Sequence, residues 1–213
     1  MKKMYLLFLV ILPLTAFKLQ NDPAAEKLLK SVSDKFSTYK TVYAEFEYQL
    51  YNPDADLHQD TKGRVRISGN KYYAEYEGVI DLFDGTKRYL IIPENKEINV
   101  STPSEEDEEI TPAKIFNFFK HGYRFKMDIK QPVQGRIIQY VKLLPIKEDN
   151  EVNYVLVGID IRTKNIYKVI IIQKDKTRIT LTVRKLDVNK PMSEQLFRFD
   201  RSKYPGYTIN DLD

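Results

Sequence analysis

A two-residue alternation of apolar and other side chains runs through most of this chain and limits what it can fold into. Apolar residues occupy every second position from Val42 to Leu50. Successive side chains of an extended strand point to opposite faces, so this pattern predicts a strand with one apolar face. Similar segments follow one another, and short turns such as Gly69-Asn70 and Asp84-Gly85 separate them. The sequence therefore predicts a mainly β protein of consecutive antiparallel strands.

The alternation predicts about eleven short strands. So many sequential strands favour a closed or nearly closed antiparallel sheet, because closure removes exposed strand edges. The segment 52–60, which contains a proline and several aspartates, is expected to be a loop. The predicted strands are 42–50, 64–68, 72–76, 79–83, 88–92, 97–101, 136–144, 153–161, 166–173, 177–186 and 197–199.

Two amphipathic helices interrupt the alternation. Asp22-Pro23 is a typical helix start, and apolar residues recur at helical spacing from there to Tyr39. Thr111-Pro112 is expected to begin a second, short helix that carries four large apolar residues. Each helix needs an apolar surface to cover, and the concave face of the sheet is the only large one available. One sheet wrapped around two helices is the expected architecture.

The N-terminus has the parts of a secretory signal peptide. Lys2 and Lys3 precede an apolar run that ends near Pro13 and Ala16, and this run is too short to span a bilayer. We expect residues 1–16 to be cleaved and residues 17–213 to form one domain in the periplasm. An uncleaved membrane anchor is the alternative reading.

Composition excludes several classes of function. The chain has no Cys and only two His, which excludes thiol catalysis, disulfides and a multi-histidine metal site within one chain. The formal net charge is only +4, and removal of Lys2 and Lys3 would lower it further, so a dedicated nucleic-acid binder is not expected. No nucleophile elbow and no phosphate-binding glycine loop occurs. We expect no enzymatic activity, no cofactor and no bound metal.

The aromatic residues point to a binding cavity. The chain has 15 Tyr, 11 Phe and no Trp, spread over predicted strand faces and both helices. Most of these residues fit an ordinary core, but a curved sheet lined by them and covered by helices is able to hold an acyl chain. The alternation places the candidates on one face, although a slip of one residue would turn the strand members outward. The expected acyl-chain-binding residues are Phe36, Phe46, Tyr48, Tyr72, Tyr76, Ile115, Phe116 and Phe119.

The order of several short motifs resembles the periplasmic carriers of outer-membrane lipoproteins, the LolA-like family. The similarity covers essentially the whole chain after the signal peptide, and each motif is weak alone. The stretches that carry it are the first helix followed by 42–46, 63–67 leading to 71–76, 84–93 followed by 96–100, Thr111-Pro112, and the ending 197–200 with 204–207.

The resemblance implies an incomplete, half-open antiparallel barrel with lid helices over an apolar cavity. It also implies a monomeric carrier that takes acylated lipoproteins from an inner-membrane lipoprotein-releasing transporter and delivers them to the outer membrane, where a separate acceptor is possible. In the family an Arg-Pro pair often follows the Gly-initiated strand, and its Arg is thought to hold the lid closed. Here Gly69-Asn70 stand at those positions, so this role is not carried over, and neither Arg64 nor Arg66 takes it.

Two rival functions remain open from the sequence. A binding module of the same fold would sense lipoproteins or envelope stress and report to a membrane partner. An enzyme on a similar barrel, such as a lipid hydrolase, is the second rival, and the missing nucleophile motif counts against it.

Overall fold

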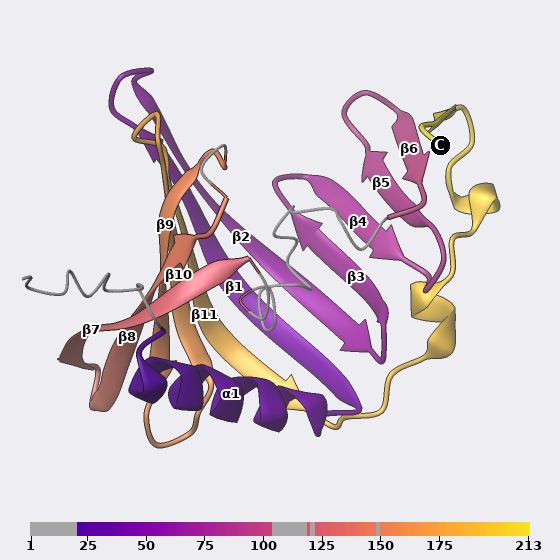
Figure 1. Ribbon diagram of the computed structural model, residues 1–213. Coiled ribbons are helices and arrows are strands. Elements are labelled where there is room, and N and C mark those ends of the chain that lie inside the picture. The colour runs from indigo at the N-terminus through magenta and orange to yellow at the C-terminus, as the bar shows by residue number, and fades with distance from the viewer. Residues whose placement is uncertain (1–20, 104–118, 120–121, 148–149) are drawn as a thin grey trace, which may run out of the picture.

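The computed structural model of the protein describes residues 21–103, 119, 122–147 and 150–213 (Figure 1). The expected signal peptide, the helix expected to begin at Thr111-Pro112 and the candidates Ile115 and Phe116 lie outside these residues.

One long helix and a single sheet of twelve strands make up the described chain. Two short 3-10 helices, η3 (Glu194–Phe197) and η4 (Arg201–Lys203), precede the last strand. The other elements are α1 (Pro23–Ser37), β1 (Thr41–Asn52), β2 (Leu57–Ser68), β3 (Lys71–Tyr76), β4 (Val79–Phe83), β5 (Arg88–Ile92), β6 (Glu97–Ser101), β7 (Tyr123–Val133), β8 (Arg136–Pro145), β9 (Val152–Asp160), β10 (Ile166–Gln173), β11 (Arg178–Val188) and β12 (Thr208–Asp211).

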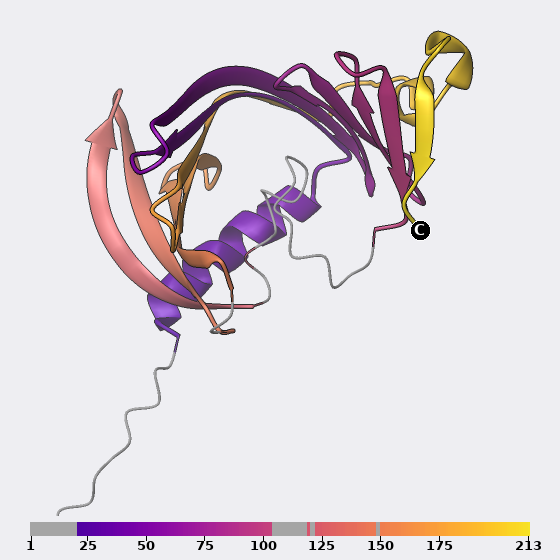
Figure 2. The ribbon, with the colours of Figure 1, turned by 90° about the horizontal axis from the view of Figure 1, so that it is seen from above.

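The sheet is strongly curved but not closed. Its strand order is β12-β6-β5-β4-β3-β2-β1-β11-β10-β9-β8-β7, so β12 and β7 are its outer edges. Neighbouring strands are antiparallel, apart from the parallel pair β6 and β12. Figure 2 shows the sheet as an arch with α1 inside it. The prediction of a mainly β, half-open antiparallel sheet with a helix over its concave side is confirmed.

Two details of the predicted strands and loops are wrong. The segment 197–199 is not a strand, because Phe197 ends η3, whose N-cap Ser193 accepts a hydrogen bond from the Gln195 N–H. The expected loop 52–60 shrinks to a four-residue turn, since the Asn52 side chain accepts hydrogen bonds from the N–H groups of Asp54 and Ala55.

The two strands that the alternation missed are β7 and β12. A register shift between Met127 and Lys130 interrupts the two-residue pattern of β7. The four residues of β12 are mostly polar, and their backbone adds to the edge of β6.

α1 packs its apolar side on the concave face. Ala25, Leu29 and Val32 are buried there with side chains of β1, β2, β3, β8, β9 and β10 in one large cluster, which we call the inner core. The helix begins where the pattern predicts and ends at Ser37, two residues before the expected end.

The start of α1 is tied to β7. The Asp22 carboxylate accepts hydrogen bonds from the N–H groups of Ala24 at 2.8 Å and Ala25 at 3.3 Å, and its second oxygen accepts one from the Met127 N–H at 3.3 Å. The Asp22 N–H donates to the Phe125 carbonyl at 3.0 Å. These bonds, led by the one from Ala24, lower the pKa of Asp22 below its ordinary value.

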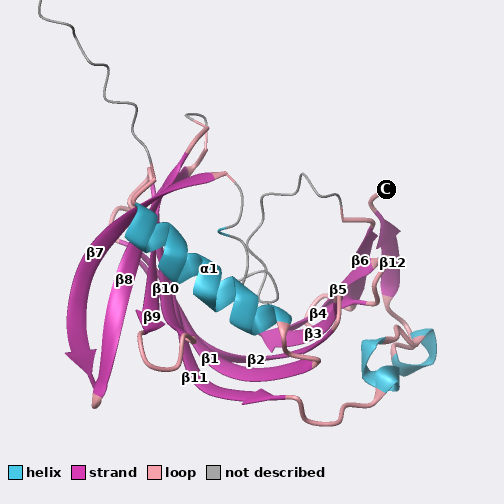
Figure 3. Ribbon diagram, turned by 60° about the horizontal axis from the view of Figure 1, so that its bottom comes forward, coloured by secondary structure: helices cyan, strands magenta, loops and turns pink. Residues whose placement is uncertain are grey.

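The C-terminal segment covers the other face of the sheet. Phe199, Tyr204 and Tyr207 pack on Ile91 and Ile98 of β5 and β6, and the Phe199 ring stacks on Tyr89 with centroids 4.3 Å apart. The short helices lie beside β6 and β12, away from α1 (Figure 3). β4 to β6 are therefore packed on their outer face as well.

Replacing Asp22 by Ala should lower the urea midpoint more than replacing Asp34, an exposed carboxylate of the same helix that pairs only with Lys30. The stabilisation by Asp22 requires the ionised carboxylate. It is fully present above the unfolded-state pKa and is lost as the pH falls through the lowered folded-state pKa. The difference between the two variants should therefore disappear in strong acid, and a difference that persists there would contradict this assignment.

Candidate functional site

The candidate site is the concave face of the sheet, where the structure brings the described candidates together. Phe46, Tyr72 and Phe119 are buried in the inner core, with exposed fractions of 4%, 7% and 2%. Phe36, Tyr48 and Tyr76 are half-buried against the same cluster. Six of the eight candidates therefore share one apolar surface, and the facing deduced from the alternation is the observed one.

The apolar surface continues past the residues that α1 covers. Tyr48 lies opposite Leu181 of β11, which in turn lies opposite Val169 of β10. Tyr48 and Leu181 are only half-buried, as are Ile171 and Val152 near them in the sheet. Figure 1 shows these strands rising well beyond α1. This part of the concave face keeps apolar side chains accessible to a ligand.

An ion pair is built into the same face. Asp81 of β4 lies opposite Ala74, a member of the inner core, and its side chain is fully buried. Arg88 of β5 donates to both carboxylate oxygens, from Nε at 2.9 Å and from Nη2 at 2.8 Å. The hydroxyls of Tyr72 and Tyr76 donate to the same carboxylate at 3.0 Å and 3.4 Å.

This network explains why an aspartate is tolerated in an apolar wall. A buried carboxylate is stable only when it is paired and its lone pairs are used, and here four donors supply both. Burial, followed by the negative charge of Asp81, raises the pKa of the Tyr72 phenol, so Tyr72 stays a donor at all ordinary pH values. The two tyrosines were predicted as purely apolar lining, yet each presents a ring and a bound hydroxyl.

The sequence did carry a signal for this ion pair that the alternation argument overlooked. Asp81 interrupts the apolar run from Val79 to Phe83, and Arg88 follows at the start of the next strand. An acidic residue at a core position needs a basic partner, and in a tight hairpin such a partner lies on the adjacent strand.

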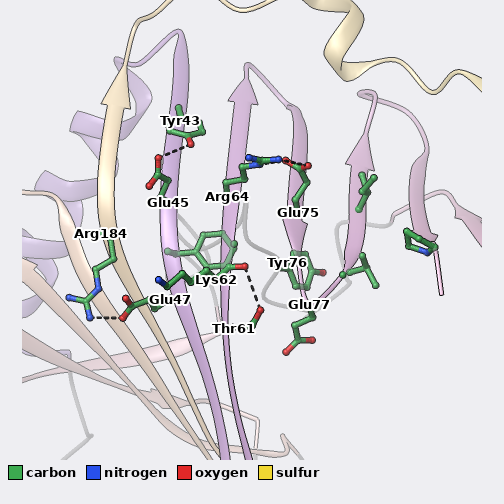
Figure 4. Close-up of a pocket in the computed structure, with 16 residues that line it drawn as sticks. Tyr43, Glu45, Glu47, Thr61, Lys62, Arg64, Glu75, Tyr76, Glu77 and Arg184 are labelled. Atoms are coloured by element: carbon green, nitrogen blue, oxygen red, sulfur yellow. Dashed lines mark hydrogen bonds and ion pairs between the residues drawn. The ribbon is translucent and has the colours of Figure 1, made fainter. Parts of the chain in front are cut away.

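An opening lies beside β2 at the end of β3, and most of its lining side chains, such as Tyr43, Glu45 and Lys62, belong to the outer face of the sheet. The opening has a volume of about 820 Å³ and lies where β3 ends while β1 and β2 continue (Figures 1 and 4). Phe46, Gly63 and Tyr76 line it from the concave side. We call it the β2–β3 opening.

Gly63 is required at this opening. A Cβ atom at this position would lie 2.3 Å from the Phe46 ring and 2.9 Å from the Glu75 carbonyl oxygen. The missing side chain lets Phe46 lie flat across β2. Any larger residue would push the ring out of its place beside the opening.

Charged side chains surround the outer side of the opening. Arg64 is ion-paired with Glu75, and Arg184 with Glu47 (Figure 4). The pairing with Arg64 lowers the pKa of Glu75. Arg64 and Arg66 both bind Glu75, which faces away from the inner core, so neither is placed to act inside the concave face.

Two other kinds of site were looked for among the described residues. No group of three or more Asp, Glu, His or Cys side chains is arranged there to hold a metal ion. No helix in that part of the chain combines the length and the apolar character needed to cross a membrane.

Comparison with known proteins gives matches at the level of structure only. No protein-family model and no curated protein matches the sequence. An uncharacterized conserved protein from Thermus thermophilus has a TM-score of 0.59 at 8% identity, covering 88% of this chain and 99% of that chain. This likeness shows a shared fold.

Two further structures are of proteins whose names refer to LolA or to lipoprotein sorting. A LolA superfamily protein from Nitrosomonas europaea has a TM-score of 0.45 and 11% identity, and the match covers 82% of this chain and 97% of that one. A putative outer membrane lipoprotein-sorting protein domain from Vibrio parahaemolyticus has a TM-score of 0.44 and 13% identity. That match covers 81% of this chain and 97% of that chain. Both are structures that this chain is similar to.

Replacing Asp81 by Leu should destabilise the protein by about 3–5 kcal/mol, because Arg88 then loses its buried counter-charge. The double variant Asp81→Leu with Arg88→Met should regain much of that loss, since an apolar pair needs no desolvated charges. Urea unfolding of both variants measures this coupling. The control is Asp54→Ala, which breaks an exposed ion pair with Lys176 and should cost less than about 1 kcal/mol. Equal losses for Asp81→Leu and the double variant would contradict the buried-pair reading.

Proposed function

We propose that this protein is a non-enzymatic carrier of lipidated proteins that binds their acyl chains on the concave face of its sheet. The observation that carries the proposal is the half-exposed apolar surface around Tyr48 and Leu181, which continues the buried inner core. An accessible apolar surface inside a curved sheet suits a flexible alkyl chain better than a polar substrate.

The energetics favour such a role. Burial of an acyl chain gains about 0.8 kcal/mol per CH₂ group, so an acylated protein needs a covered apolar site to cross an aqueous compartment. A non-directional apolar contact also tolerates chains of different length. The Asp81–Arg88 network holds the Tyr72 and Tyr76 hydroxyls in place on the same face, while the acyl chains lie against Tyr48 and its half-exposed neighbours.

The partners follow from this function. We propose acylated lipoproteins as the cargo, an inner-membrane lipoprotein-releasing transporter as the donor, and the outer membrane as the destination. The leader expected at residues 1–16 would bring the chain to the periplasm, where it would act as a monomer.

Native mass spectrometry of the protein purified from the periplasm without detergent tests the proposal. We expect adducts whose masses match acylated proteins or phospholipids, and binding of an added diacylated lipopeptide. The same preparation after delipidation is the control and should bind the lipopeptide again. A bare chain that also ignores the added lipopeptide would overturn the carrier function and leave the sensing module as the better reading.

Replacing Tyr48 by Asp should weaken binding of a fluorescent lipopeptide at least about tenfold, because a carboxylate on the apolar surface must be desolvated when the chain binds. Tyr51→Asp is the matched control, since Tyr51 lies three residues further on the same strand, on the opposite face, with 39% exposure. Phe46→Asp should abolish binding, and circular dichroism must show that this buried position still allows folding. Equal affinities of the two tyrosine variants would remove the concave face as the binding surface.

A further inference from the structure

The free edge of β2 is the feature that the proposed function does not yet use. β1 and β2 pair along their whole length, from Thr41 with Ser68 to Asn52 with Leu57. β3 pairs with β2 only from Ser68 to Arg64. Within the described residues, nothing pairs with the other side of β2 from Leu57 to Gly63. This segment is therefore a strand edge in the middle of the sheet.

A strand edge presents unused hydrogen-bonding groups. In an antiparallel pair, successive residues of a strand direct their N–H and C=O groups alternately to one neighbour and to the other. About half of the residues from Leu57 to Gly63 therefore direct these groups away from β1, and those from Thr61 to Gly63 lie at the β2–β3 opening. An extended peptide that lies alongside can take up all of them, as in other cases of strand addition.

The free edges of the sheet differ in how well they would accept such a strand. β11 has no β10 partner beyond Thr182 among the described residues, but a register shift interrupts its pairing with β1 there. β7 carries Pro132 and an irregular register, both of which discourage pairing. β12 has only four residues. The pairing of β1 and β2 has no register shift, and 57–63 contains no proline. The β2 edge is therefore the long and regular one.

The position of this edge connects it to the apolar face. At its inner end lies Gly63, directly beside Phe46 of the inner core. Across the opening lie Tyr76 and the turn Glu77-Gly78. Lys62 stands on the β2 side and Glu77 on the turn side of the opening (Figure 4). A ligand with acyl chains on the concave face and an attached extended peptide would leave the sheet at this point.

We propose that the β2 edge from Leu57 to Gly63 binds the extended peptide segment next to the acylated residue of the cargo by strand addition. This inference rests on the proposed function and names the part of the cargo that is recognised besides its acyl chains. Backbone hydrogen bonds are independent of side-chain identity, so this mode would serve cargoes of different sequence.

Hydrogen–deuterium exchange with three probes tests the proposal. The probes are a diacylglyceryl-cysteine followed by an eight-residue flexible peptide, the same lipopeptide with N-methylated amides, and the diacylglyceryl-cysteine without a peptide. The first probe should slow exchange of about half of the amides in 57–63 at least tenfold. The probe without a peptide should leave these amides unchanged. The N-methylated probe should bind about tenfold more weakly than the first, because it lacks donors.

The outer edge of β7 is the internal control and should exchange equally fast with every probe. A second, independent readout uses the absence of native cysteine. Lys62→Cys on the outer face of β2 carries a nitroxide label, which the first probe should immobilise and the probe without a peptide should leave mobile.

Failure of this inference can be told apart from failure of the carrier function. If all three probes bind equally well and 57–63 keeps its exchange rate, strand addition is wrong while the concave face still binds acyl chains. If the first probe protects the β7 edge instead, the peptide binds elsewhere. If no probe binds, the proposed function itself fails, and the inference fails with it.

Discussion

The apolar contact between α1 and the concave face is the interaction on which the rest of this structure depends. A sheet with one apolar face is not stable in water unless something covers that face, and α1 supplies the first cover through Ala25, Leu29 and Val32. A helix of 15 residues is about 22 Å long, whereas strands of 12 residues reach about 40 Å. The helix is thus too short to cover the sheet, and among the described residues the concave face beyond α1 keeps half-exposed apolar side chains such as Tyr48 and Leu181.

Two parts of the sheet differ in how firmly they are held. On β4 to β6 the outer face is buried under the C-terminal aromatic residues, while the inner face holds the Asp81–Arg88 pair. Aromatic packing on one face and an ion pair on the other hold these strands, so β4 to β6 form a rigid wall with polar groups at fixed positions. Among the described residues, the tall hairpin of β1 and β2 has no such cover at its upper part, where most residues from Leu57 to Arg64 are exposed. We therefore expect the upper part of this hairpin, rather than β4 to β6, to adjust its shape when a partner binds.

The alternation predicted most of the fold, because each strand has one face in the inner core and a slip of one residue would expose it. It placed Phe46, Tyr48, Tyr72 and Tyr76 on the correct face for that reason. It failed where other forces hold the chain: β12 is fixed by the backbone of β6, and the segment after Ser193 by side-chain capping. The Asp81–Arg88 pair was missed because periodicity counts apolar residues and takes no account of which charged residues must meet.

An open sheet has a cost that a closed barrel avoids, since every free edge invites unwanted pairing. This chain blunts β7 with Pro132 and an irregular register and ends the other side on a four-residue strand. If the sheet only had to avoid unwanted pairing, β2 would also carry a proline or an irregular register, or β3 would be long enough to cover it. Instead β3 stops at Tyr76, and Gly63 leaves room for the Phe46 ring beside the exposed backbone. A regular edge at the border of an apolar surface is costly for stability alone, and it becomes useful once a ligand has both an alkyl part and a peptide part.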